Sequence, residues 1–303
     1  MTTLVRPPTS TTRPSLLSVS RDLSALVRPW FWPMSMAPVA FGSFLATHAW
    51  PSPGDWLRLG LVMLTVGPLV WASVFAVNDA YDVDTDRLNP RKAHSMAVRS
   101  RMTTESLVFR SLEAGLLAVV VAWLAAGVTF AFGTLVVVAL GWAYSVPPLR
   151  LKARAGCDVL VNALVIGPVG ILGGWQLERP MSQFPWAMGV LAFVVAAALY
   201  LPTTLIDLPA DRAAGVRTTA VRLGERTTYG LSLAIWTLAV SGPIVLAALD
   251  YVFPRELLSF HVVTAPVLIA LYADRLRRPS IAGLAVVAAA LGLCFLRFVV
   301  ALA

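Results

Sequence analysis

The sequence predicts an all-α integral membrane protein with nine transmembrane helices. Of its 303 residues, 58% are hydrophobic and the mean hydropathy is +0.75. Only 13% are charged, against about 25% in soluble domains. The net charge of +8 resides in short segments between apolar stretches, as in the loops of a membrane protein rather than a nucleic-acid-binding surface.

The chain begins with a polar segment that is unlike the rest. Residues 1–24 contain three prolines and many hydroxyl side chains, but no continuous apolar region of signal-peptide length. We therefore expect a disordered cytosolic tail over 1–24, followed by one membrane domain over 25–303.

The apolar stretches that follow approach the length of a membrane-spanning helix. Crossing about 30 Å of hydrocarbon takes roughly 20 apolar residues, and a helix satisfies all their backbone polar groups internally. Gly127 is nearly the whole connection between the third and fourth stretches. The predicted helices are 26–48, 57–79, 106–126, 128–145, 157–176, 185–206, 228–249, 257–274 and 280–302.

The basic residues predict the orientation of these helices. With a cytoplasmic N-terminus, most of the 24 lysines and arginines fall on the inner side, whereas Arg58, Arg179 and Arg255 fall outside. The positive-inside rule therefore predicts a cytoplasmic N-terminus and an outer C-terminus. We expect an integral protein of the inner or plasma membrane. The loops after the second and sixth helices then face the cytoplasm.

The first of these loops begins with the acidic motif NDAYDVDTD, residues Asn78 to Asp86. Asp79, Asp82 and Asp86 are spaced by three and four residues, so on a continuing helix they share one face. Asp84 lies off that face and is expected to be solvated or to cap the helix. Carboxylates that converge in this way repel one another and favour a hard cation such as Mg²⁺.

A second acidic motif follows the sixth predicted helix. Asp207 and Asp211 are four residues apart and share a helix face in the same way. One such loop is usually a solvated turn, but two at equivalent positions favour a site. Two facing patches can hold two Mg²⁺ ions around one diphosphate and stabilise it as a leaving group. Nearby basic residues that can bind phosphate oxygens are Arg87, Arg91, Lys92, Arg150, Lys152, Arg212, Arg217 and Arg222.

The remaining polar and sulfur-containing residues give weaker indications. Asp158 and Asn162 lie one turn apart at the start of the fifth predicted helix. They are either helix N-terminal charge partners or polar groups that line a cavity. Cys157 and Cys294 lack the spacing of a metal site or a disulfide framework. His94 is a lone loop histidine, which is more often solvated than catalytic.

Three motifs in this order resemble the UbiA superfamily of membrane prenyltransferases, over about residues 25–302. They are NDxxDxxxD from Asn78, YSVPPLRLK from Tyr144 and DxxxDRxxGxRT from Asp207. The resemblance implies a nine-helix UbiA-like bundle with a central cavity. It also implies Mg²⁺ ions that bridge an isoprenyl diphosphate to the aspartates, and transfer of the prenyl group to a lipophilic acceptor within the membrane.

The resemblance also implies roles for individual residues. Asn78, Asp79, Asp82 and Asp86 correspond to the first metal and diphosphate site, and Asp207 and Asp211 to the second. Tyr144, Arg150 and Lys152 correspond to residues that contact the diphosphate or close the site. The ring face of Tyr144 can stabilise a carbocation.

Different segments resemble different branches of the superfamily. LNPRK at 88–92 and the segment 211–224 are similar to lycopene elongases, whereas GPLVWASVFAVND at 67–79 is similar to chlorophyll synthases. AHSMAVRSR at 93–101 departs from the usual pattern, which leaves the acceptor class open. A UbiA-type terpene cyclase, which needs no acceptor, is the alternative. A cation transporter is disfavoured because the acids cluster at helix ends rather than at mid-membrane depth.

Overall fold

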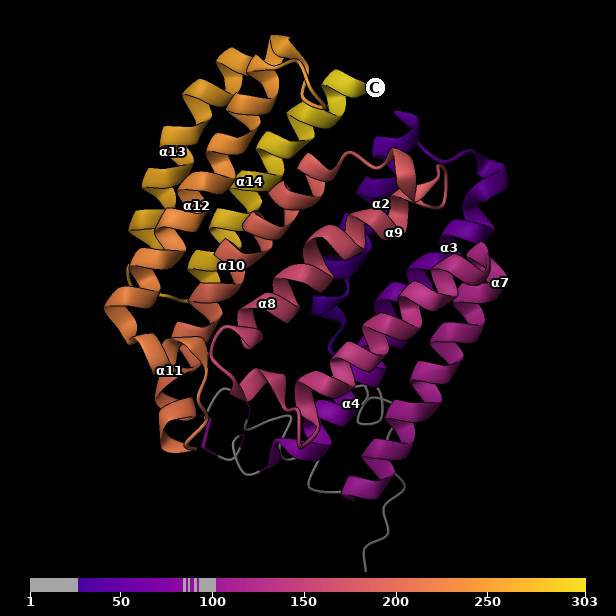
Figure 1. The fold of residues 1–303 in the computed structure, drawn as a ribbon, viewed down its shortest axis with the longest axis vertical. Coiled ribbons are helices and arrows are strands. Elements are labelled where there is room, and N and C mark those ends of the chain that lie inside the picture. Colours follow the sequence, from indigo (N-terminus) through magenta and orange to yellow (C-terminus); the bar gives the residue numbers. More distant parts are fainter. Residues whose placement is uncertain (1–26, 84–85, 87, 90–91, 93–101) are drawn as a thin grey trace, which may run out of the picture.

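A computed structural model describes residues 27–83, 86, 88–89, 92 and 102–303. In this part of the chain the architecture is a bundle of long helices (Figure 1). The α-helices are α2 (Pro33–Thr47), α3 (Trp56–Leu64), α4 (Val70–Tyr81), α7 (Thr104–Ser145), α8 (Cys157–Leu164), α9 (Gly170–Trp175), α10 (Trp186–Ala213), α11 (Thr219–Leu223), α12 (Glu225–Ala248), α13 (Leu258–Leu276) and α14 (Ile281–Leu302).

Seven continuous helical segments of the described chain are long and apolar enough to cross a membrane. The segment Pro53–Tyr81 joins α3 to α4 through the π-helical turn η3 (Thr65–Leu69), and Cys157–Trp175 joins α8 to α9 through η6 (Val165–Val169). Each π-helical turn contains a Gly-Pro pair. Since proline lacks a backbone N–H group, such a local change of hydrogen bonding lets a transmembrane helix accommodate it.

The long helix α7 is interrupted at the predicted boundary between two spans. Gly127 has φ 76° and ψ −172°, which is not helical. A straight helix of 42 residues would be about 63 Å long, twice the membrane core. Instead, Gly115 lies against Val138, so the two halves of α7 pack on each other. The predicted separation of two helices at Gly127 is therefore confirmed.

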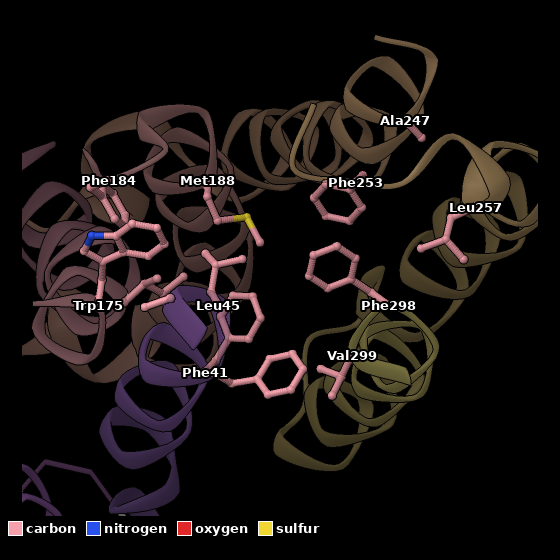
Figure 2. Packing of buried hydrophobic residues seen from close by; sticks show 13 residues of the cluster. Phe41, Leu45, Trp175, Phe184, Met188, Ala247, Phe253, Leu257, Phe298 and Val299 are labelled. Atoms are coloured by element: carbon pink, nitrogen blue, oxygen red, sulfur yellow. The ribbon is translucent and has the colours of Figure 1, made fainter. Parts of the chain in front are cut away.

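Close helix packing is clearest where α2 crosses α9. A Cβ atom added to Gly42 would lie 2.0 Å from the carbonyl oxygen of Ile171, and one added to Gly174 would lie 1.9 Å from that of Val39. The two backbones are thus in direct contact, as small residues permit in membrane bundles. Beside this crossing, aromatic side chains from α2, α9, α14 and two connecting segments form a cluster in which the rings of Phe253 and Phe298 face each other (Figure 2).

Candidate active site

Most of the predicted site residues that the structure describes surround one cavity of about 160 Å³. It lies where α4 and α10 end, at the end of the bundle opposite the C-terminus (Figure 1). Its size suits a polar head group rather than a whole isoprenoid, because pockets for drug-sized ligands span about 300–1,000 Å³. The lining side chains that can bind ions or hydrogen-bond are Asn78, Asp82, Asp86, Asn89, Lys92, Tyr144, Arg150, Lys152, Tyr200, Thr203, Thr204, Asp207, Asp211 and Thr218.

The sequence suggested that the helix continues through the first acidic motif. In the structure, the helix ends within the motif. α4 ends at Tyr81, and Asp82 at its C-cap has φ −110° and ψ 7°. Aspartate has low helix propensity, and the Asp82 carboxylate is drawn to basic side chains of another loop. The backbone N–H group of Asp86 still donates to the carbonyl of Asp82 at 2.8 Å. This turn places Asn78, Asp82 and Asp86 in the cavity wall.

Asp79 has a different environment from its neighbours. It is buried, and its Oδ1 atom accepts a hydrogen bond from Arg28 at 2.7 Å. The Arg28 guanidinium lies over the ring of Phe75, 4.4 Å from its centroid. Asp79 is not among the described residues that line the cavity. It therefore connects α4 to the segment before α2.

Basic side chains bind the carboxylates that face the cavity. Lys152 Nζ lies 2.5 Å from Asp82 Oδ1 and 2.9 Å from Asn78 Oδ1. Arg150 approaches the same Asp82 oxygen at 3.5 Å, and Lys92 Nζ lies 2.5 Å from Asp86 Oδ1. Burial lowers the pKa of Lys152 from its ordinary value, and the charge of Asp82 opposes this shift. These contacts bring the YSVPPLRLK loop against the first acidic motif.

The second acidic motif lies on α10, which continues past the predicted end at residue 206 to Ala213. Asp207 and Asp211 thus project from the last turns of a transmembrane helix into the cavity. Asn89 Nδ2 donates to Asp207 Oδ1 at 2.9 Å, and Thr218 Oγ1 donates to Asp211 Oδ2 at 3.1 Å. The first of these contacts joins segments 118 residues apart. The structure therefore brings the two acidic motifs to one cavity.

Tyr144 and Tyr200 meet across the cavity. Their hydroxyl oxygens are 2.7 Å apart, with Tyr144 on α7 and Tyr200 on α10. Sequence reasoning singled out Tyr144 but missed Tyr200. Tyr200 lies two helical turns before Asp207 and so shares its face, which is a signal that the sequence contained.

Some predicted phosphate-binding residues lie elsewhere. Arg212 and Arg217 are exposed and are not among the described residues that line the cavity. Arg91 lies outside the described residues, as do Asp84, Arg87 and His94. Asn89 lines the cavity although sequence reasoning gave it no role.

The donor set of the cavity suits Mg²⁺. Its candidate ligands are all oxygen atoms, from Asp82, Asp86, Asp207, Asp211 and Asn78. The described residues contain no group of three His, Cys, Asp or Glu side chains already gathered around one point. Mg²⁺ in phosphate sites typically takes one or two carboxylates and completes its shell with phosphate and water. The buried Arg150 Nε has no hydrogen-bond partner in the described structure, which suits an anion in the same cavity.

A helical bundle with apolar spans and with acidic and basic side chains around one cavity defines an integral membrane protein with a charged ligand-binding site. A family model described as the UbiA prenyltransferase family matches residues 35–281, and the chain belongs to this family. It is 32% identical to a lycopene elongase/hydratase of Haloferax volcanii over 254 residues. This aligned region covers 80% of this chain and 77% of that protein.

Two further comparisons give another similar protein and a solved structure with the same fold. A protoheme IX farnesyltransferase of Thermus thermophilus is 26% identical over 266 residues, which are 86% of this chain and 42% of that protein. The solved structure of a UbiA homolog from Archaeoglobus fulgidus bound to GPP and Mg²⁺ matches with a TM-score of 0.73 at 22% identity. That match covers 93% of this chain and 99% of the other.

Proposed function

We propose that the protein ionises an isoprenyl diphosphate with the help of Mg²⁺ and transfers the prenyl group to a lipophilic acceptor in the membrane. The main observation in support is that carboxylates of both acidic motifs line one cavity, with the segment after the first motif bound to the second through the hydrogen bond from Asn89 to Asp207. Basic side chains in the same wall match the charge of a diphosphate.

The residues that line the cavity have different proposed roles. Asp82, Asp86, Asp207 and Asp211, with Asn78, hold Mg²⁺, which when bound supplies charge neutralisation for the departing diphosphate.

When the diphosphate binds, its oxygens replace the carboxylates as the partners of Lys152, Arg150 and Lys92. Each such contact is a charge-assisted hydrogen bond. Arg212 and Arg217 are exposed, so their expected contribution is a general attraction of the anion to this end of the bundle. Arg91, next to Lys92 in sequence, keeps its predicted role in phosphate binding.

Asp79 acts indirectly, by holding Arg28 and the segment before α2 against α4. The Tyr144–Tyr200 pair lies deeper along α10 than Asp207, where the prenyl carbon leaves the polar site. The electron-rich ring faces can stabilise a carbocation there.

The proposed acceptor is a long, apolar isoprenoid of the lycopene type. The support is the 32% identity to the lycopene elongase/hydratase, over most of both chains. The LNPRK and 211–224 segments resemble the same branch.

The proposed topology has nine membrane crossings within one domain over residues 25–303. Among the described residues, α7 contributes two crossings because Gly127 interrupts it, and the short helix α2 contributes one. The cavity then opens to the cytoplasm, where soluble diphosphates are available.

The decisive experiment supplies purified protein with Mg²⁺ and dimethylallyl, geranyl, farnesyl or geranylgeranyl diphosphate, with and without lycopene. We expect diphosphate release and an elongated product that require lycopene, and loss of both in Asp207→Asn. Cyclic hydrocarbons formed without an acceptor would establish the terpene cyclase instead. Absence of diphosphate release with every substrate would contradict both reactions.

A further inference from the structure

Asp158 is a buried carboxylate that lies outside the lining of the cavity. It occupies the first turn of α8 and is 1% exposed. Its Oδ1 atom accepts a hydrogen bond from the backbone N–H group of Gly156 at 3.1 Å. An aspartate in the first turn of a helix commonly makes such a local contact. That role alone would make Asp158 a helix-stabilising residue.

Its other contacts reach a distant segment. Asp158 Oδ2 accepts from the backbone N–H group of Thr219 at 2.8 Å, and Oδ1 accepts from the Thr219 hydroxyl group. Thr219 Oγ1 in turn accepts from the backbone N–H group of Gly156 at 2.8 Å. Thr219 lies 61 residues along the chain from Asp158, so a local helix cap does not account for these bonds.

The segment that Asp158 binds carries part of the second acidic motif. Thr219 begins α11, and its neighbour Thr218 donates to Asp211 Oδ2 at 3.1 Å. Both threonines are buried. Two consecutive side chains therefore make different contacts, Thr218 with the acid that lines the cavity and Thr219 with Asp158.

The segment before Asp158 carries the basic side chains proposed to bind phosphate. Arg150 and Lys152 lie in the connection between α7 and α8, six and four residues before Gly156. A backbone bridge between Arg154 and Arg217 joins the same two segments a second time. A shift at the Asp158–Thr219 contact would thus move Asp211 relative to Lys152.

We propose that Asp158 and Thr219 are positioning residues that fix the distance between the second metal motif and the phosphate-binding loop. This inference rests on the proposed function. An ionised carboxylate suits the position because it only accepts hydrogen bonds, and the three groups that face it all donate. An asparagine there would present N–H groups to at least one of these donors.

The test compares Thr219→Val, which removes the hydroxyl group at nearly constant shape, with Thr219→Ser, which keeps it. We expect Thr219→Val and Asp158→Asn to raise the KM for geranylgeranyl diphosphate by about tenfold. The kcat should change by less than about threefold, because the catalytic residues themselves are intact. Thr219→Ser should retain the wild-type KM.

Thr228→Val is the matched control. Thr228 is buried near the same end of the bundle, but its hydroxyl group bonds the carbonyl oxygen of Gly224 within the first turn of its own helix. Its KM should be that of the wild type. An equal rise in the KM of Thr228→Val, or failure of Thr219→Ser to restore affinity, would indicate general loosening and overturn the proposal.

A second measurement does not depend on turnover. Geranylgeranyl S-thiolodiphosphate with Mg²⁺ should raise the melting temperature of the wild type and Thr219→Ser in detergent, and Thr219→Val should need about tenfold more of it. A wild type that neither turns over nor binds this probe would refute the proposed function. An active wild type with an unchanged Thr219→Val would refute the positioning role alone. If Asp158→Asn does not fold, the comparison of Thr219→Val with Thr219→Ser still tests the positioning role.

Discussion

Lys152→Met removes the cation that lies deepest between the two parts of the site. The ammonium group contacts Asp82 and Asn78, and the side chains of Lys152 and Asp82 are 11% and 9% exposed. Methionine keeps most of the apolar stem, so the main loss is the charge. A charge-assisted hydrogen bond contributes about 1.5–3 kcal/mol. We therefore expect the KM for the isoprenyl diphosphate to rise about 10- to 150-fold.

The same change also affects the protein without substrate. Removing one partner of a buried ion pair typically costs about 3–5 kcal/mol. Arg150 also lies 3.5 Å from the Asp82 oxygen that Lys152 binds, so we expect the lower end of this range. The melting temperature in detergent should fall, and added Mg²⁺ should restore part of the loss by compensating Asp82.

The assay is steady-state diphosphate release at saturating acceptor, with chromatography of the products. Arg110→Met is the control, because Arg110 is exposed, pairs with Glu113 on its own helix and is not among the described lining residues. Its KM should match the wild type. A KM of Lys152→Met within twofold of the wild type would refute the phosphate-binding role, as would a changed product at unchanged KM.

Three further predictions follow from single contacts. Asp82→Asn should lower diphosphate release about 100-fold or more, since an amide replaces a charged ligand at the departing group; near-normal release would exclude Asp82 as a metal ligand. Tyr144→Phe and Tyr200→Phe remove the same hydrogen bond, so the double variant should lose little more kcat than either single variant; fully additive losses would show that the hydroxyl groups act separately. Gly174→Ala should destabilise the protein by about 1–3 kcal/mol or more, because the new methyl group meets backbone, whereas Gly133→Ala, which meets nothing within 4 Å, should not lower the melting temperature.

Local patterns in the sequence predict the helical spans. They also predict that the two acidic motifs lie close together. Apolar length located the spans, and the equivalent places of Asp82 and Asp207 after two spans indicated a shared site. Gly127 was placed at a boundary because it is nearly the whole connection between two apolar stretches, and the structure shows a non-helical conformation there that glycine readily adopts. The family comparison then confirmed the resemblance carried by the three motifs.

The other features of the site depend on contacts between distant segments. The spacing of residues along the sequence carries no information about such contacts. Asp79 shares the spacing of the motif, yet its partner is Arg28, far away in sequence. The two interpretations of Asp158 could not be separated until the position of Thr219 was known. The end of α4 at Tyr81 is likewise accompanied by a contact from a distant segment, because Lys152 binds the carboxylate of Asp82 at the C-cap.

The continuity of α10 has a consequence for the membrane around the protein. One helix carries Tyr200 within the bundle and Asp211 beyond it, about 16 Å apart along the helix axis at 1.5 Å per residue. Transmembrane helices respond to bilayer thickness by tilting. A tilt of α10 would displace its acidic end relative to Asn89, which belongs to another segment. A change in the thickness of the surrounding bilayer would therefore alter the geometry of the cavity.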